Sequence, residues 1–425
     1  GLFTYAFLDF VMNIGKRFNI IDIVVPLSTL TWLVMPVVTY NIFNESDSLA
    51  KLWDTYMKIS SERYFTYALP ATILFVLGLK IPFKEPNFHH KEYIDSLKSE
   101  MNGKSRVSLL FLLIGIIATL LVRITPEIFR NIVFNFSYLT FVGMFYAIFS
   151  NFKQKSLIIS VCVFLLIAQV IVSGMYGPLI YIGIMTFLVI SVAKGIGLKF
   201  KILGLAIGIF GIFLIQSIKG EYREAVWDGL NRGSDPVVFA SIVVKKILNP
   251  VELFEPIRLF GMTVRANQGL IVADAMNYVP KNEPFAGGET ITLAVISSFI
   301  PRFLWPSKPK AGGAENVCRF LGDCTSSKLG VSYNLGPIGE AYVNFGVLGG
   351  IIFMFFYGMF MKFCFVKVLR LSINFPTLLL WIPLLFIPVF SMENDVLSFV
   401  NSFLKSAFFC FVCYKGFYIL FRIRI

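Results

Sequence analysis

The chain has 425 residues, of which 56% are apolar and only 15% are charged, and its mean hydropathy is +0.75. A water-soluble domain carries about 25% charged residues, so the composition excludes an ordinary soluble fold and predicts a membrane protein. The net charge of +13 does not indicate a nucleic-acid partner, because the basic residues follow a pattern that membrane topology explains.

Apolar runs long enough to cross a bilayer dominate the chain. A run of about 18 residues or more is typical of a spanning helix. We therefore expect an all-α polytopic membrane protein with about 10–11 transmembrane helices. Residues 1–15 are a further apolar stretch, either a truncated span or a helix lying in the interface. The predicted spans are residues 19–43, 64–82, 106–123, 131–150, 156–174, 177–193, 201–218, 341–361, 375–391 and 397–420.

The basic residues predict the orientation of these spans. Lys and Arg concentrate in cytoplasmic loops, and here they alternate between the two ends of successive spans. The segment from Lys219 to Glu340 lies on the side poorer in them, and its thirteen basic and twelve acidic residues nearly cancel. We expect this segment to lie outside the cytoplasm and the C-terminus to lie inside, in a membrane whose anionic lipids reinforce the bias.

The outer segment, residues 219–340, contains several short helical patterns. Each is too small to bury a core of its own, so we expect a lid of short helices on a single membrane domain rather than an independent domain. The stretch 259–278 is interrupted near Arg265, and the short apolar stretch 291–299 suits a re-entrant or interfacial helix. The other predicted parts are a helical extension at 220–227, a helix at 235–246 and turns at 282–289.

The cysteines and histidines indicate no metal or cofactor. Cys318 and Cys324 lie in the outer segment with five residues between them, so we predict a disulfide in an oxidising compartment. The spacing of Cys410 and Cys413 resembles a redox or metal motif, but their apolar surroundings favour packing. The adjacent pair at positions 89 and 90 is the whole histidine content and has no spaced third ligand, which favours a solvated loop.

The arginines of the outer segment suit an anionic substrate. Arginine is always charged and binds phosphate oxygens through two parallel hydrogen bonds. For any one arginine the alternative is an ion pair with an acid of the segment or with a lipid headgroup, but the set as a whole favours an anionic ligand. No nucleotide-binding P-loop and no zinc pattern accompanies them. The predicted binding residues are Arg223, Arg258, Arg265 and Arg302.

Two motifs resemble a known family. Residues 301–309 read PRFLWPSKP, and residues 334–350 read NLGPIGEAYVNFGVLGG at the opening of a span. This pairing resembles the Wzy-type O-antigen polymerases, the oligosaccharide repeat-unit polymerases of bacteria. Many of those relatives carry an arginine in a turn between two middle spans, but residues 173–178 read SGMYGP here, so the resemblance implies no phosphate contact at this turn.

The resemblance implies a fold, an activity and a location. The fold would be similar to the GT-C-type membrane glycosyltransferases, with the large loop in the periplasm and the spans in the bacterial cytoplasmic (inner) membrane. The enzyme would need no metal or cofactor. It would transfer a growing glycan from undecaprenyl diphosphate to a repeat unit on another undecaprenyl diphosphate at the outer leaflet. Its partners would be these lipid-linked oligosaccharides and the bilayer, and could include a chain-length regulator.

Such a transfer needs fixed cations at the departing diphosphate and a base for the attacking hydroxyl. We predict that Arg223, Arg265 and Arg302 hold the diphosphate and that Glu340 is the base. The alternative for Glu340 is that it pairs with one of these arginines and only holds the loop in place. Glu221 and Asp395 are the next candidates for the base.

Two rival functions remain open at this point. An O-antigen ligase-like enzyme would use the same chemistry on a different acceptor, but such ligases use a histidine of the outer loop, and residues 219–340 contain none. A flippase or other transporter of lipid-linked oligosaccharides should instead show cationic residues along a central path.

Overall fold

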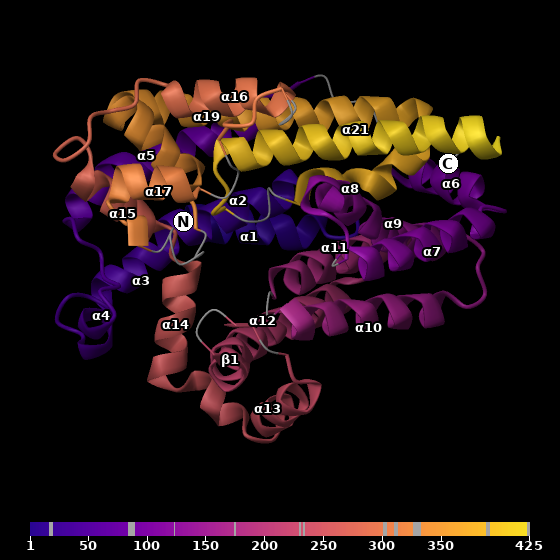
Figure 1. The fold of residues 1–425 in the computed structure, drawn as a ribbon, viewed down its shortest axis with the longest axis horizontal. Coiled ribbons are helices and arrows are strands. Elements are labelled where there is room, and N and C mark those ends of the chain that lie inside the picture. The colour runs from indigo at the N-terminus through magenta and orange to yellow at the C-terminus, as the bar shows by residue number, and fades with distance from the viewer. Residues whose placement is uncertain are drawn as a thin grey trace.

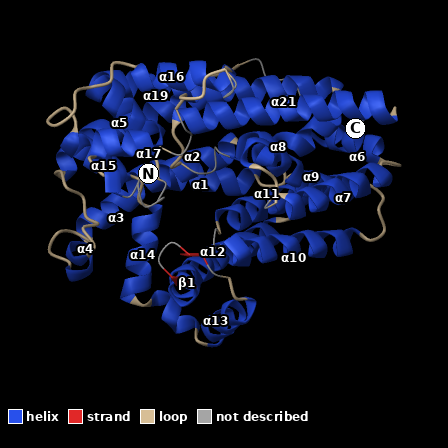
Figure 2. Ribbon diagram, viewed as in Figure 1, coloured by secondary structure: helices blue, strands red, loops and turns tan. Residues whose placement is uncertain are grey.

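The computed structural model describes residues 1–16, 20–83, 90–122, 124–173, 176–228, 231–232, 234–300, 304–309, 313–325, 333–387 and 392–422. These residues are mainly helical, as Figures 1 and 2 show, and the strands β1 (Trp227–Asp228) and β2 (Asn231–Arg232) form one short antiparallel pair. The predicted all-α class is therefore confirmed. The helices are α1 (Leu2–Asn13), α2 (Ile21–Thr29), η1 (Leu30–Val34), α3 (Met35–Asn41), α4 (Ser48–Leu52), α5 (Ser61–Lys80), α6 (His90–Met101), α7 (Ser105–Leu121), α8 (Glu127–Ser137), α9 (Leu139–Phe149), α10 (Lys155–Ser173), α11 (Gly177–Lys194), α12 (Leu198–Val226), α13 (Pro236–Leu248), η2 (Pro250–Phe254), α14 (Pro256–Ala266), α15 (Gly269–Tyr278), α16 (Glu289–Phe299), α17 (Ala314–Leu321), α19 (Gly336–Asn374), η3 (Pro376–Trp381), α20 (Ile382–Phe386) and α21 (Val396–Phe421).

Several of these helices are candidate membrane spans. In the described part of the chain five are long and apolar enough to cross a bilayer, and the bent pair α6–α7, with an angle of 82°, would make a sixth. This matches the expectation of a multi-pass membrane protein. The five candidates are Ile21–Asn41, Ile132–Phe149, Leu198–Val226, Gly336–Asn374 and Val396–Ile419.

The other predicted spans also coincide with helices, but these do not have the length and hydropathy of the five. The predicted span 64–82 is α5, whose first turns carry polar and tyrosine side chains. The predicted span 375–391 begins as two short helices, η3 and α20, with Pro376 as the first residue of η3 and Pro383 as the second residue of α20. Residues 156–174 and 177–193 correspond to the shorter apolar helices α10 and α11.

The core of the molecule lies between α5 and α19. Gly78 on α5 and Gly358 on α19 face each other so closely that a Cβ at either position would overlap the backbone of the other helix. Such small residues let helices approach and pack without water. Within α19, Gly346 adopts φ +67° and kinks the helix, a conformation that glycine tolerates at little cost. The first turns of α19 are thereby separated from its long apolar part.

The outer segment divides into two groups of helices instead of forming one layer. Helix α15 packs on α19, and α16 packs on α19 and α21. In Figure 1, α16 lies along the upper edge of the bundle and α15 lies at the left. Helix α13 packs on α12, and α13 and η2 form the lower projection, which is followed by α14. The interruption predicted near Arg265 is the end of α14 at Ala266, three residues before α15 begins.

Candidate functional site

Near the C-terminal end of α12, Lys219 is under the electrostatic influence of two arginines from two helices. Lys219 and Arg223 are one helical turn apart on α12, and Arg265 lies in the last turn of α14. Lys219 is within electrostatic range of Arg223, of Arg265 and of the carboxylate of Glu393. We call Lys219, Arg223 and Arg265 the basic cluster. Arg223 and Arg265 were both predicted to bind substrate, and the structure places them near the same residue.

The carboxylate of Glu393 lies beside the basic cluster. Its Oε2 atom lies 3.0 Å from Nη2 of Arg265, and the two side chains are 25% and 50% exposed. Such a pair is accessible to solvent, so it contributes little to stability and can be exchanged for another anion. Glu393 lies in the segment that leads into α21, where Asp395 caps the helix by accepting a hydrogen bond from the Ser398 N–H at 2.7 Å.

The backbone that carries Arg265 is anchored by Asn267, two residues further along the chain. Asn267 is 2% exposed, and its side-chain Nδ2 donates a hydrogen bond of 2.7 Å to Oγ1 of Thr39 on α3. This contact fixes the C-terminal end of α14 against α3. The guanidinium of Arg265 therefore extends from an anchored backbone toward the head of α21.

Glu340 lies on the other side of the same segment, fully buried. Its Oε2 accepts the backbone N–H of Val396 at 2.8 Å, and its Oε1 accepts the hydroxyl of Thr290 at 2.9 Å. Nδ2 of Asn344 donates to Oγ1 of Thr290 at 2.7 Å and to the carbonyl oxygen of Glu340 at 2.8 Å. Each carboxylate oxygen of Glu340 thus has a donor, and α16, α19 and α21 are joined through one side chain.

This geometry bears on the two roles considered for Glu340. One predicted role for Glu340 was to pair with an arginine and hold the loop in place. Among the residues that the structure describes, no ion pair joins Glu340 to an arginine, and its partners are Thr290 and the Val396 N–H instead. A base must reach the hydroxyl that it deprotonates, whereas Glu340 has no exposed surface. The arrangement fits a side chain that holds helices together, with a hydroxyl and a backbone N–H as partners.

Arg258 belongs to α14 and lies apart from the basic cluster, against another face of α12. Its guanidinium is 3.3 Å from Glu221, and Glu221 is 3.0 Å from the ammonium of Lys246. Lys246 is also 2.6 Å from Glu252, and its side chain is only 1% exposed. We call Arg258, Glu221, Lys246 and Glu252 the fastening cluster. Burial opposes the charge of Lys246, but hydrogen bonds to the two carboxylates outweigh it and raise the pKa of Lys246.

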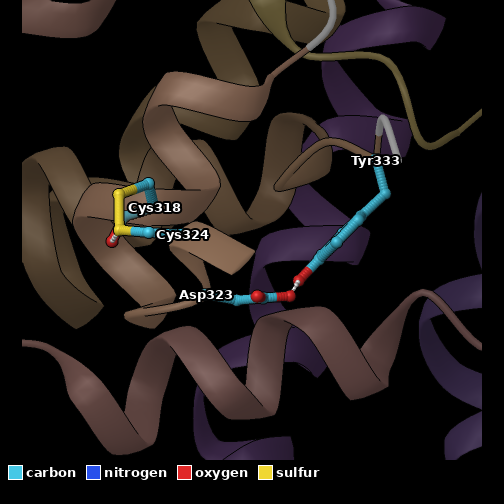
Figure 3. The surroundings of a disulfide bond; sticks show 4 residues. All are labelled: Cys318, Asp323, Cys324 and Tyr333. Carbon is cyan, nitrogen blue, oxygen red and sulfur yellow. Dashed lines mark hydrogen bonds between the residues drawn. A yellow bond between two sulfur atoms is a disulfide. The ribbon is translucent and has the colours of Figure 1, made fainter. Parts of the chain in front are cut away.

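The remaining predicted residues are a disulfide and one arginine. The structure contains the predicted disulfide between Cys318 and Cys324, with Cα atoms 4.3 Å apart (Figure 3). Beside it the hydroxyl of Tyr333 donates a hydrogen bond of 2.7 Å to Asp323. Arg302 lies outside the described residues.

The sequence reasoning did not predict that Lys219 and Glu393 lie at the basic cluster, and it did not single out Asp274. Lys219 could have been found from its i, i+4 spacing to Arg223, which places both on one face of a helix. Glu393 has no local signal for its role, since its partner Arg265 is 128 positions earlier. Asp274 lies 3.6 Å from Lys58, and its partial burial raises its pKa to about 6, although Lys58 opposes this.

Comparisons with known proteins give a family and no further relative. A family model described as a Domain of unknown function (DUF8712) matches residues 27–421. No curated protein and no solved structure matches the chain. Among the described residues no group of three or more His, Cys, Asp or Glu side chains is arranged to hold a metal ion.

Proposed function

The chain belongs to the family described as Domain of unknown function (DUF8712), and we propose that it is a membrane glycosyltransferase that joins lipid-linked oligosaccharide repeat units. The donor is a glycan on undecaprenyl diphosphate, and the acceptor is a repeat unit on a second such lipid at the outer leaflet of a bacterial inner membrane. We further propose that the enzyme has about ten membrane spans and an architecture of the GT-C type. The resemblance of residues 301–309 and 334–350 to the Wzy-type polymerases suggests it.

The observation that carries the proposal is the position of the basic cluster. Residues 202–218 of α12 contain no charged side chain, and Lys219 and Arg223 follow directly. Cations at the end of an apolar span lie at the level of lipid phosphates. A diphosphate bound there by Lys219, Arg223 and Arg265 would keep its polyprenyl chain beside α12, whose candidate span is only 6% buried inside the protein.

The cations also suit the departure of the diphosphate. In the transfer, the acceptor hydroxyl oxygen forms a bond to the anomeric carbon of the donor glycan, and the bond from that carbon to the diphosphate breaks. The diphosphate leaves with the electron pair and gains negative charge, which fixed cations stabilise more strongly in the transition state than before it. Two arginines can each make paired hydrogen bonds to its oxygens.

For the base we propose Glu393 in preference to Glu340. Glu393 is 25% exposed and sits at the basic cluster, whereas Glu340 is buried and both of its oxygens accept hydrogen bonds. A diphosphate that binds Arg265 would replace the carboxylate of Glu393 as its partner. Glu393 would then be free to take the proton of the acceptor hydroxyl. Glu340 is in this account a positioning residue, which fixes the head of α21 through Val396.

Reconstitution with the isolated lipid-linked repeat unit tests the proposal. Purified protein in liposomes should convert single units into a ladder of longer glycans on undecaprenyl diphosphate, and Arg265→Ala should abolish the ladder while the protein remains folded. A protein that only moves the units across the bilayer, making no ladder, is the flippase alternative and would overturn the proposal. Transfer to a different acceptor without any ladder would favour the ligase alternative.

A further inference from the structure

The projection formed by α13 and η2 exposes apolar side chains. Six residues between 237 and 254 are more than half exposed, although all are aliphatic or aromatic. An isolated exposed apolar side chain is ordinary, but a contiguous group marks a surface that something other than water covers. The six are Val237 (77%), Val244 (54%), Ile247 (54%), Leu248 (73%), Val251 (80%) and Phe254 (58%).

The projection is fixed rigidly to the rest of the protein. Ile242 on α13 packs with Ile218 and Tyr222 of α12 in a small apolar cluster of its own. The fastening cluster adds the buried ammonium of Lys246 between Glu221 and Glu252. Because these contacts set the rotation of α13, the exposed face is a defined surface of the fold and not the result of a loosely placed helix.

The level of the exposed face along α12 identifies what covers it. The ring of Phe254 contacts that of Phe213 on α12, with centroids 5.8 Å apart. Phe213 precedes Lys219 by six residues, which is about 9 Å along a helix at a rise of about 1.5 Å per residue. Lys219 is the first charged residue after the uncharged stretch of this candidate span. The tip of the projection is therefore deeper than the charges that end the span.

A depth of about 9 Å below the charges that end the span is typical of segments that lie in the membrane interface. Amphipathic segments lying on a membrane bury their apolar face about 5–10 Å into the boundary between headgroups and acyl chains. The charged side chains of the projection are Lys245, Lys246 and Glu252. They gather with Glu221, which is beyond Lys219 on α12. Apolar groups thus lie at the depth of the acyl chains, and charged groups lie at the level of the headgroups.

We propose that α13 and η2 are a membrane anchor whose exposed apolar face is inserted in the leaflet that surrounds the outer end of α12. The partner is the lipid bilayer itself. The projection contacts α12 through Phe254 and Phe213, and Phe210, one turn before Phe213, is 42% exposed. Only 6% of the candidate span in α12 is buried inside the protein, which supports lipid over a protein partner for the adjoining face. The inference does not depend on the proposed function.

Nitroxide labels in the whole protein test the anchor. Single cysteines replace Leu248 and Val251, and the protein is reconstituted in liposomes of phosphatidylethanolamine and phosphatidylglycerol. Labels at Ile207→Cys and Glu224→Cys serve as the lipid-facing and water-facing references, since both positions are exposed on α12. Protein without an added cysteine gives the background, which should be low because Cys162, Cys364, Cys410 and Cys413 are buried.

Collision with oxygen, which concentrates in lipid, is compared with collision with a water-soluble nickel chelate. We expect the oxygen rate to exceed the nickel rate several-fold at 248 and 251, as at 207, and the reverse at 224. A higher nickel rate at 248 and 251 would place the projection in water and overturn the proposal. Low rates with both reagents would mean that protein, such as a second copy of this chain, covers the face, and this also overturns it.

Discussion

The two charged groups on α12 show how one helix uses the same residue types in opposite ways. On one face, Glu221 joins the fastening cluster, where the Lys246 side chain is 1% exposed and lies between two carboxylates. On another face, Lys219 interacts electrostatically with Arg223 and with Arg265, whose side chain is 50% exposed. A buried charge must be paired because desolvation is costly, whereas an exposed one can exchange partners. The exposure of the Arg265–Glu393 pair, and not the number of charges, marks the candidate binding group, because Lys219 of that group is itself partly buried.

The largest expected effect separates the two carboxylates at the head of α21. Under the proposed function, Glu393→Gln should lower polymer formation about 1,000-fold, within the range of about 10²–10⁴ for removal of a general base. Glu340→Gln should keep the Val396 contact to its remaining amide oxygen and stay within about threefold of wild type, because positioning and not proton transfer is its role. Polymer formation in liposomes, with protein amount held equal, measures both.

Two results would change this assignment. A folded Glu340→Gln protein that makes no polymer would return the base to Glu340. A Glu393→Gln protein with normal polymer would remove Glu393 from the mechanism but leave the proposed function intact.

The next effect concerns the geometry of the basic cluster. Arg265→Lys keeps the charge but loses the paired hydrogen bonds to a diphosphate, so polymer formation should fall about 10- to 100-fold. The thermal midpoint should not change, because the Arg265–Glu393 pair is exposed. The control is Lys245→Arg, which replaces an exposed lysine beside Glu221 of the fastening cluster. This variant should leave activity unchanged. Equal activity of the Arg265→Lys and wild-type proteins would exclude a bidentate role.

The third prediction concerns the stability that the fastening cluster contributes. Lys246→Met leaves Glu221 and Glu252 without their closest cation and should lower the free energy of unfolding by about 2 kcal/mol. This is less than the roughly 3–5 kcal/mol of a fully buried pair, since the two carboxylates are 28% and 26% exposed.

Lys245→Met is the matched control for that variant. Lys245 faces the same two carboxylates at 3.7 and 3.9 Å but is 54% exposed, so its loss should cost at most about 0.5 kcal/mol. Unfolding in detergent, together with protease cleavage near residues 234–258, gives the readout. Equal destabilisation by both variants would show that burial does not distinguish the two lysines.

The smallest expected effect is a pH dependence at Asp274. Its pKa rises from 3.8 to about 6 on folding, mainly through burial, so the folded protein binds this proton more tightly than the unfolded chain does. Stability from this group is present at low pH and is lost as pH rises through about 6. Because the side chain is 34% exposed, the screened contribution is only about 1 kcal/mol.

Asp274→Asn should remove this dependence. Between about pH 4 and pH 7 the wild type should lose about 1 kcal/mol of stability relative to the Asp274→Asn protein. Asp54→Asn, at the more exposed partner of Lys58, is the control and should keep the wild-type slope. Parallel stability curves for wild type and Asp274→Asn would contradict the raised pKa.

The sequence by itself determined the helices, because the length and hydropathy of an apolar run are local properties. The predicted ranges 201–218 and 397–420 correspond to α12 and α21. Helix α12 extends further, from Leu198 to Val226, whereas α21 exceeds its range by only one residue at each end. The disulfide between Cys318 and Cys324 also has a local cause, since the two residues are six positions apart. Even the break near Arg265 is visible, as the end of α14 at Ala266.

Only the tertiary structure decided which charged residues share a site. Arg258 and Arg265 lie on the same short helix, yet their carboxylate partners are Glu221 on α12 and Glu393 before α21. Glu340 likewise takes its hydrogen-bond donors from residues 50 positions earlier and 56 positions later. An ion pair or a hydrogen bond depends on distances of a few ångströms, and packing of helices far apart in sequence sets those distances.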